Sequence, residues 1–304
     1  MVMIKRVLAL LGSGALAILL LRQAETAAQA VRDGVQLCLT SVIPALFPFF
    51  AVSSLLVALG AAEAAGRVLA HPFRRLFRCG GAGCAALLLG LVGGYPVGAR
   101  TAAELVRRGE LSPAEGARLL TFCNNAGPAF AIGVAGVSVF GSARTGVWLY
   151  LLHCAAALLT GLLFCRRPLP VTAMPKRPVP PRAGLTGQFL RAVEGAVSAM
   201  ARVCGFVVFF LVLLRLAEGL IGPLPPLAAG VLELTNGILR LTPDRRGFVT
   251  AAALLGWGGL SVHCQTAAVT AGSGISLRLY LPAKAVQAAL SAGLAALLAP
   301  YLLP

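Results

Sequence analysis

Polar side chains occur inside two stretches of this sequence that are otherwise apolar and free of charge. The first stretch is 119–143 and the second is 247–277. The polar residues in them include Asn124, Asn125, Ser261, His263 and Gln265. Amides, hydroxyls and imidazoles form hydrogen bonds, and such groups at membrane depth usually serve a solute or a neighbouring helix. These residues therefore predict a site that binds a small polar solute.

The common patterns of catalytic and metal sites are missing from the sequence. His71, His153 and His263 lie far apart, and no HExxH, GxSxG or phosphate-binding loop motif is present. The eight cysteines are scattered singly, without a CxxC pair. We therefore expect no enzyme, no metal and no cofactor. A membrane-embedded hydrolase is the alternative from the enzyme class.

The composition indicates a membrane protein. The 304 residues are 58% hydrophobic and 12% charged, against roughly 25% charged residues in soluble domains. The net charge is +16, from 26 Lys and Arg against 10 Asp and Glu. The basic residues cluster between the apolar stretches, as the positive-inside bias of membrane proteins predicts. We therefore expect no nucleic-acid partner.

Apolar runs of about 20 residues predict the membrane spans. The expected spans after the N-terminus are 35–60, 118–140, 145–165, 203–222 and 285–304. The last run can begin near Leu279 if the Lys284 ammonium reaches the membrane surface. Before them, Lys5 and Arg6 precede an apolar segment that is typical of a signal anchor or of a cleavable signal peptide. We favour the anchor, which gives an all-α fold with about six transmembrane helices.

Two glycine-rich motifs interrupt the remaining apolar runs. They are "GLVGGYPVGARTAA" from Gly90 and "GWGGLSVHCQTAA" from Gly256. Gly and Pro interrupt helices, and broken backbone at membrane depth must be buried in protein or line a cavity. Each motif therefore predicts a re-entrant helical hairpin with its tip at the Gly-Gly pair. Alternatively, the glycines only allow close helix packing.

The two motifs also suggest an internal repeat. Aligned with one gap, 11 of 18 residue pairs of 85–103 and 251–268 are identical. A path that starts in the cytoplasm puts 17 of the 26 Lys and Arg inside, and it makes the halves an inverted-topology repeat. The expected organisation is an anchor with an outer loop (1–34), a first repeat with a connecting span (35–165), a basic Pro-rich cytoplasmic linker (166–187) and a second, inverted repeat (188–304).

Broken segments at matching positions of inverted halves are the usual place of a transporter's binding site. Helix N-termini at the tips attract anions, and neither hairpin's broken segment contains a carboxylate. The break at "FCNNAGPAF" adds two amides at similar depth. The predicted substrate-binding residues are Gly93, Gly94, Tyr95, Pro96, Arg100, Thr101, Asn124, Asn125, Gly258, Gly259, Ser261, His263 and Gln265. The predicted substrate is small and polar or anionic.

Four motifs together resemble a known family. "GLVGGYPVGA", "NNAGP", "ELTNG" and "GWGGLSVHCQ" are similar to the nucleoside-recognition (Gate) family, in particular to its sporulation integral membrane proteins of the YlbJ type. The resemblance covers about 35–295. It implies a role in endospore formation, with movement of dipicolinic acid out of the mother cell towards the forespore. The family is in turn similar to concentrative nucleoside transporters, which use two hairpins in inverted repeats.

The resemblance and the residues leave alternatives open. A nucleoside transporter and a non-transporting scaffold in spore maturation are both retained. The expected location is the bacterial cytoplasmic membrane, here that of the mother cell or the outer forespore membrane, with both termini cytoplasmic. The expected partners are a small-molecule solute and the lipid bilayer, and a homo-oligomer is left open.

Overall fold

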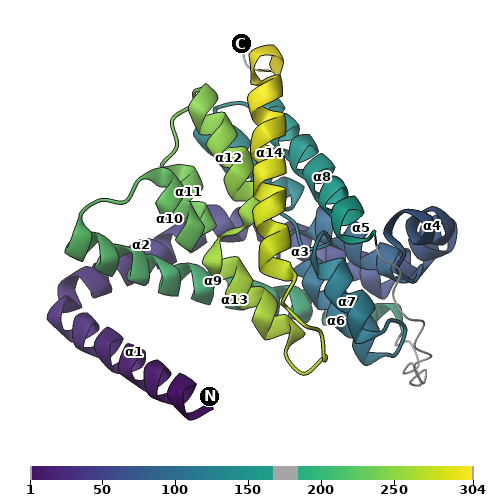
Figure 1. The fold of residues 1–304 in the computed structure, drawn as a ribbon, viewed down its shortest axis with the longest axis horizontal. Coiled ribbons are helices and arrows are strands. Elements are labelled where there is room, and N and C mark those ends of the chain that lie inside the picture. The colour runs from purple at the N-terminus through teal and green to yellow at the C-terminus, as the bar shows by residue number, and fades with distance from the viewer. Residues whose placement is uncertain (1, 167–183, 303–304) are drawn as a thin grey trace.

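The computed structural model describes residues 2–166 and 184–302, and every regular element in these ranges is a helix. The predicted all-α class is thereby confirmed. The first half contains α1 (Val2–Arg22), α2 (Ala24–Leu37), the π-helical η1 (Cys38–Val42), α3 (Ile43–Ala58), α4 (Ala61–Phe77), α5 (Gly83–Gly93), α6 (Val97–Arg107), α7 (Pro113–Leu120), the π-helical η2 (Ala129–Val139) and α8 (Ala143–Phe164). The second half contains α9 (Leu185–Ile221), α10 (Pro226–Leu232), α11 (Leu234–Leu239), α12 (Arg245–Trp257), α13 (Gly259–Thr270) and α14 (Tyr280–Leu302). Figure 1 shows α14 standing between α12 and α8.

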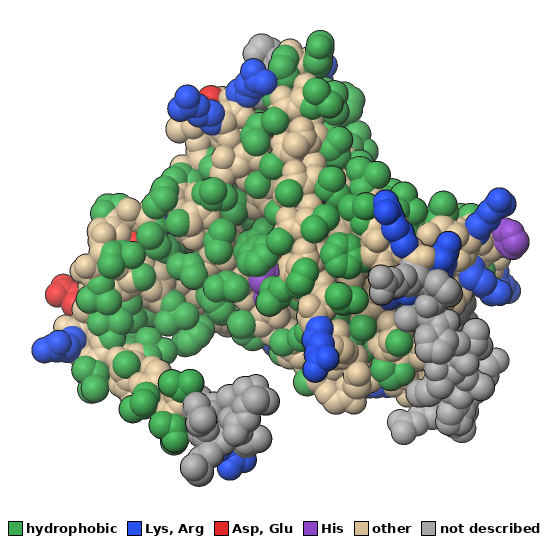
Figure 2. Space-filling view, in the orientation of Figure 1, with side chains coloured by type: hydrophobic (Ala, Val, Ile, Leu, Met, Phe, Trp, Pro, Cys, Tyr) green, Lys and Arg blue, Asp and Glu red, His purple; other side chains and the backbone are tan. Residues whose placement is uncertain are grey.

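Four segments are long and apolar enough to cross a membrane. They are Ala143–Phe164, Leu185–Ile221, Arg245–Thr270 and Tyr280–Leu302, and the bent pair α1–α2 with η1 would make a fifth. The sequence predicted about six, of which the last three fall within α8, α9 and α14. Hydrophobic side chains cover most of the face drawn in Figure 2, whereas Lys and Arg gather towards its edges. This surface is that of an integral membrane protein.

The first glycine-rich motif forms a helical hairpin. Helix α5 ends at Gly93, α6 begins at Val97, and the two helices pack against each other. A Cβ atom on Gly90 would lie 3.0 Å from the Cα of Gly98. The backbone reverses at Gly94, whose φ of 75° favours glycine. The predicted first hairpin is therefore present as a pair of packed helices.

The second motif does not form the predicted hairpin over 247–277. Helices α12 and α13 are separated by Gly258 alone and continue as one broken segment, Arg245–Thr270. Three non-helical residues separate α5 from α6, and that is enough to turn the chain back. One glycine at φ 91° only interrupts the helix. Gly258 and Gly259 are therefore a mid-span break and not a tip.

A second helical pair lies where the sequence analysis predicted none. Helices α10 and α11 are joined at Glu233 and pack against each other. A Cβ atom on Gly237 would collide with the backbone of Gly230, so both glycines are needed for this close approach. The α10–α11 pair repeats the glycine-to-glycine contact of the α5–α6 hairpin.

Contacts at the helix ends fix the relative directions of the last spans. The Arg107 guanidinium donates to the carbonyl oxygens of Val269 and Ala271, which places the end of α6 beside the end of α13. The Arg245 guanidinium donates to the carbonyl oxygen of Ala296, which places the start of α12 beside the last turns of α14. The broken segment α12–α13 therefore runs from one side of the bundle to the other, and α14 returns.

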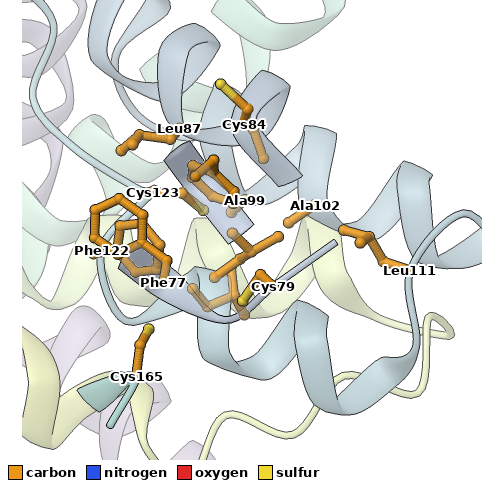
Figure 3. Packing of buried hydrophobic residues seen from close by; sticks show 14 of the residues in the cluster. Phe77, Cys79, Cys84, Leu87, Ala99, Ala102, Leu111, Phe122, Cys123 and Cys165 are labelled. Carbon is orange, nitrogen blue, oxygen red and sulfur yellow. The ribbon is translucent and has the colours of Figure 1, made fainter. Parts of the chain in front are cut away.

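A core of apolar side chains holds the first hairpin. The rings of Phe77 and Phe122 stack with centroids 4.6 Å apart, and small residues of α5 and α6 pack around them, among them Ala99 and Ala102 (Figure 3). The predicted span 118–140 is not one continuous helix, because 121–128 is non-helical between α7 and η2. Most of the predicted linker 166–187 lies outside the described residues.

Candidate functional site

Four interruptions of helices meet around one pocket. They contact one another in pairs, and they are the hairpin turn at Gly94, the stretch 121–128, the Glu233 junction and the break at Gly258. A Cβ on Gly94 would lie 2.9 Å from the Gly127 nitrogen, and one on Gly259 would lie 3.0 Å from the Leu234 nitrogen. The empty space between the walls is about 490 Å³, including the part open to the outside. The residues that line it include Phe50, Gly93, Gly94, Tyr95, Ala126, Gly127, Val207, Glu233, Thr235, Ser261 and Gln265.

The pocket wall contains a buried carboxylate. Glu233 is 1% exposed, and its Oε2 accepts hydrogen bonds from the backbone nitrogen and the side-chain Nδ2 of Asn236, both at 2.8 Å. This placement corrects the expectation that no acidic residue lies near the broken segments. The expectation missed Glu233 because the α10–α11 pair was not predicted. The pocket therefore offers an acceptor as well as hydroxyl and amide groups.

A lysine lies behind the pocket wall. Lys284 on α14 is 0% exposed, and its Nζ donates to the Gln287 Oε1 at 2.7 Å, to the Asn124 carbonyl oxygen at 3.1 Å and to the Tyr95 hydroxyl at 3.3 Å. The last span does begin near Leu279, at Tyr280, but the Lys284 ammonium does not reach the membrane surface, which was the condition given for that extension. Three neutral oxygens close to the ammonium hold it inside the bundle.

The paired amides belong to the same network. The Gln287 Nε2 donates to the Asn125 Oδ1 at 2.9 Å. The Asn124 Nδ2 donates to the Thr266 hydroxyl at 2.8 Å and to the Tyr280 hydroxyl at 3.2 Å. Asn124 and Asn125 are both 0% exposed. They tie the break of the first half to α13 and α14.

Tyr95 connects the pocket with this network. This residue lines the pocket, and its hydroxyl donates to the Leu255 carbonyl oxygen at 2.8 Å while it accepts from Lys284. A Cβ atom on Gly258 would lie 3.1 Å from that hydroxyl. The glycine break of the second motif therefore leaves room for the tyrosine of the first.

Three buried polar atoms near the pocket have no hydrogen-bond partner among the described residues. They are the Ser261 Oγ, the Asn124 Oδ1 and the His263 Nε2. The other ring nitrogen of His263 lies 3.2 Å from the Tyr280 hydroxyl. A buried polar atom without a partner costs about 1–3 kcal/mol. These atoms are therefore free to bind a solute or water.

The structure divides the thirteen predicted site residues into four groups. Gly93, Gly94, Tyr95, Ser261 and Gln265 line the pocket. Asn124, Asn125 and His263 lie in the network behind it. Pro96, Gly258 and Gly259 shape the breaks. Arg100 is exposed and Thr101 bonds its own helix at the Val97 carbonyl oxygen, so neither lies at the pocket.

Sequence reasoning missed Glu233, Thr235, Gln287 and Lys284. A signal was present for the lysine, because Lys284 is the one charged residue between Arg278 and the end of the sequence. An ionisable residue within a membrane span marks a functional site by default. Glu233 belongs to the motif "ELTNG", but nothing in its immediate sequence indicates that it lies beside Ser261.

Part of the chain is similar to a known protein family. The sequence model of the Gate family, described as nucleoside recognition, matches residues 39–143. This segment is similar to a Gate domain. It contains the hairpin turn, both amides of the break and the start of α8. The pocket therefore lies between the Gate-like segment and residues of the second half, namely Glu233, Ser261 and Gln265.

Most of the chain also resembles a curated protein. It is 27% identical, over 310 aligned residues, to the sporulation integral membrane protein YlbJ of Bacillus subtilis (strain 168), covering 85% of this chain and 74% of that protein. The resemblance stated from the sequence motifs is confirmed. No solved structure matches the chain.

Proposed function

We propose that this protein moves a small polar solute across a bacterial membrane through the pocket at the four helix breaks. The observation that carries the proposal is the meeting of these breaks beside buried polar atoms that have no partner in the described ranges, such as the Ser261 Oγ. Interrupted helices are tolerated at membrane depth only inside protein or around a water-filled cavity. In secondary transporters such breaks hold the solute.

We further propose that the two halves form an inverted repeat with a pairing that differs from the one the sequence suggested. Hairpin α5–α6 corresponds to the pair α10–α11, the broken segment 113–139 corresponds to 245–270, and α8 corresponds to α14. The hairpins then enter from opposite faces and reach the same depth. In this arrangement 245–270 is a full crossing, so the C-terminus lies outside and not in the cytoplasm as the sequence predicted.

The proposed substrate is dipicolinate, exported during endospore formation from the mother cell. The resemblance to a sporulation membrane protein supports the setting. Hydrogen-bond donors at Ser261, Gln265 and Tyr95 suit carboxylates, and the aromatic ring of Tyr95 suits a planar heterocycle. The ammonium of Lys284 adds positive charge one side chain behind the wall.

One observation favours a second candidate, a nucleoside. The Glu233 carboxylate can accept from hydroxyl groups of a sugar, and it repels a dianion that comes close. The Gate family description also names nucleoside recognition. The Glu233 carboxylate should therefore favour the binding of a nucleoside and oppose the binding of dipicolinate.

Uptake by proteoliposomes decides between the candidates. Purified protein is reconstituted, and labelled dipicolinate or uridine is added outside. We expect saturable dipicolinate uptake, reduced by Ser261→Ala and raised by Glu233→Gln. Uridine uptake that Glu233→Gln abolishes would establish the nucleoside instead. Uptake of neither solute by well-folded protein would favour the scaffold role.

A further inference from the structure

Lys284 is a buried amine with no carboxylate beside it. Its side chain is 0% exposed, and no carboxylate oxygen within the described ranges lies within 4.0 Å of its Nζ, whose hydrogen-bond partners are all neutral. Transfer of an ammonium from water to the interior is costly unless an opposite charge compensates it. In the empty protein the uncharged amine is therefore the favoured form of Lys284.

The ionisable side chains that surround Lys284 do not supply the missing charge. They are Tyr95 from the hairpin turn, Cys123 from the 121–128 break, His153 from α8, His263 from α13 and Tyr280 from α14. Tyrosine and cysteine are ordinarily neutral near pH 7, and histidine is neutral or positive. The nearest carboxylate of the pocket, Glu233, is bonded to Asn236 instead.

The pocket can bring an anion close to Lys284. Tyr95 lines the pocket, and its hydroxyl accepts a hydrogen bond from Lys284. A carboxylate that accepts the Tyr95 hydroxyl proton would replace the Leu255 carbonyl oxygen as its acceptor. The resulting chain runs from the ammonium through the hydroxyl to the carboxylate, with the charges about 6 Å apart for two hydrogen bonds in series.

We propose that Lys284 takes up a proton from solution when an anion occupies the pocket, so that the protein binds and carries the two together. This inference rests on the proposed transport function. The proton adds to the neutral amine Nζ, no other bond forms or breaks, and the pocket gains one negative and one positive charge. Because such coupling is reciprocal, a protonated Lys284 also binds the anion more tightly.

Calorimetry on the purified full chain tests the coupling directly. Dipicolinate is titrated into the wild type in two buffers of different ionisation enthalpy, between about pH 6 and pH 9. Its carboxylates are ionised throughout this range, since carboxyl groups titrate near pH 4, so any proton taken up belongs to the protein. We expect uptake of up to one proton for each bound anion, and affinity that rises as the pH falls, by at most tenfold for each pH unit.

Two variants assign the proton to Lys284. Lys284→Arg keeps a permanent charge, so it should retain affinity while proton uptake and pH dependence are lost. Lys284→Met should lose the proton uptake and the pH dependence. Its affinity should also be on the order of 100-fold lower, as expected for charges about 6 Å apart at an effective dielectric of about 20. His263→Gln tests whether the imidazole takes up the proton instead, because it removes a neighbouring titratable group and leaves Lys284 in place, and only its proton uptake is compared, since His263 belongs to the network behind the pocket. It should keep the proton uptake.

The outcomes separate this inference from the transport proposal. Wild-type binding without proton uptake would overturn the coupling and leave the pocket intact. Proton uptake that persists in Lys284→Arg, or that disappears only in His263→Gln, would assign the proton to another residue. A wild-type protein that is folded but binds no dipicolinate would overturn the anion pocket, and the coupling with it.

Discussion

The Nζ of Lys284 lies 3.1 Å from the carbonyl oxygen of Asn124 and donates a hydrogen bond to it across 160 positions of the sequence. One turn further along α14, the Gln287 amide bonds the side chain of Asn125. The last span of the second half therefore holds the break of the first half with two consecutive contacts. Two of the hydrogen bonds of the non-helical stretch 121–128 therefore depend on α14.

Gln287→Leu should destabilise the protein strongly. The substitution removes the 2.7 Å acceptor of the Lys284 ammonium and the donor to the Asn125 Oδ1, and it leaves both groups buried. A buried donor or acceptor left without its partner costs about 1–3 kcal/mol. We expect a lower melting temperature in detergent, measured by the intrinsic fluorescence of the purified protein.

Ser291→Ala on the same helix is the control for that prediction. The Ser291 Oγ is buried and has no hydrogen-bond partner in the described part of the chain. Its removal should therefore leave the melting temperature close to that of the wild type. An equal drop in the melting temperature of both variants would mean that α14 is sensitive to any substitution. The contacts to 121–128 would then contribute little to stability.

Much of the architecture could be predicted from the sequence because it depends on local properties. Apolar runs gave α8, α9 and α14, and the Asn-Asn-Ala-Gly-Pro stretch gave the break at 121–128. The direction of a chain after a glycine break could not be predicted in the same way. It depends on the number of non-helical residues between the two helices, which is three after Gly93 and one after Trp257. The two motifs are alike in composition, so the sequence does not reveal this difference.

The site was predicted in part for a related reason. Ser261, Gln265 and Tyr95, three of the predicted residues, line the pocket, since polar groups next to backbone breaks are available to a solute. Lys284 was misplaced because a lysine near the end of an apolar run can extend to the membrane surface. Its burial depends on acceptors at Asn124 and Tyr95, which lie far away in the sequence and become neighbours only in the fold.

Gly90→Ala should reduce the amount of folded protein. A Cβ atom there would collide with the carbonyl oxygen of Cys123 and lie 3.0 Å from the Cα of Gly98. Backbone atoms cannot move aside as a flexible side chain can, so the hairpin must open. Size-exclusion chromatography of a fluorescent fusion in detergent measures the folded fraction.

Gly293→Ala is the matched change on α14. No atom lies within 4 Å of a Cβ built at Gly293, and Ala is favoured over Gly in a helix by up to about 1 kcal/mol. This variant should fold as well as the wild type or better. If Gly90→Ala also elutes like the wild type, the close packing of the hairpin is not required for folding.

Asp244→Ala should lower stability in a pH-dependent manner. The exposed Asp244 carboxylate caps α12 by accepting from the Gly247 nitrogen at 2.7 Å, and this bond is the main reason why the pKa of the carboxyl lies below its usual value. A lowered pKa in the folded protein adds stability above the unfolded value of about 3.9. That stability is lost as the pH falls through the folded pKa.

The melting temperatures of the wild type and of Asp244→Ala should therefore differ near pH 7 and converge below about pH 4. Asp244→Asn is the control, because Asn is also a good N-cap residue and carries no charge. It should lie close to the wild type at pH 7. A gap that stays constant down to pH 3 would show that the carboxylate charge has no part in the capping.

The C-terminus should lie on the side opposite to the 271–279 loop. Arg245 bonds the Ala296 carbonyl oxygen, so the end of α14 lies beside the start of α12, whereas Arg107 bonds Val269 and Ala271 at the other end of the segment.

Single cysteines at Ser276 and Thr242 in a cysteine-free background can be labelled with a membrane-impermeant maleimide in intact cells, with a tag at the C-terminus probed in parallel. The positive-inside bias puts the 166–187 linker in the cytoplasm, so we expect labelling at 242 and access to the tag from outside, but no labelling at 276 until the membrane is opened. Labelling of positions 242 and 276 from the same side, with the tag on the opposite side, would contradict the full crossing by 245–270, and it would restore the re-entrant hairpin that the glycine motif first suggested.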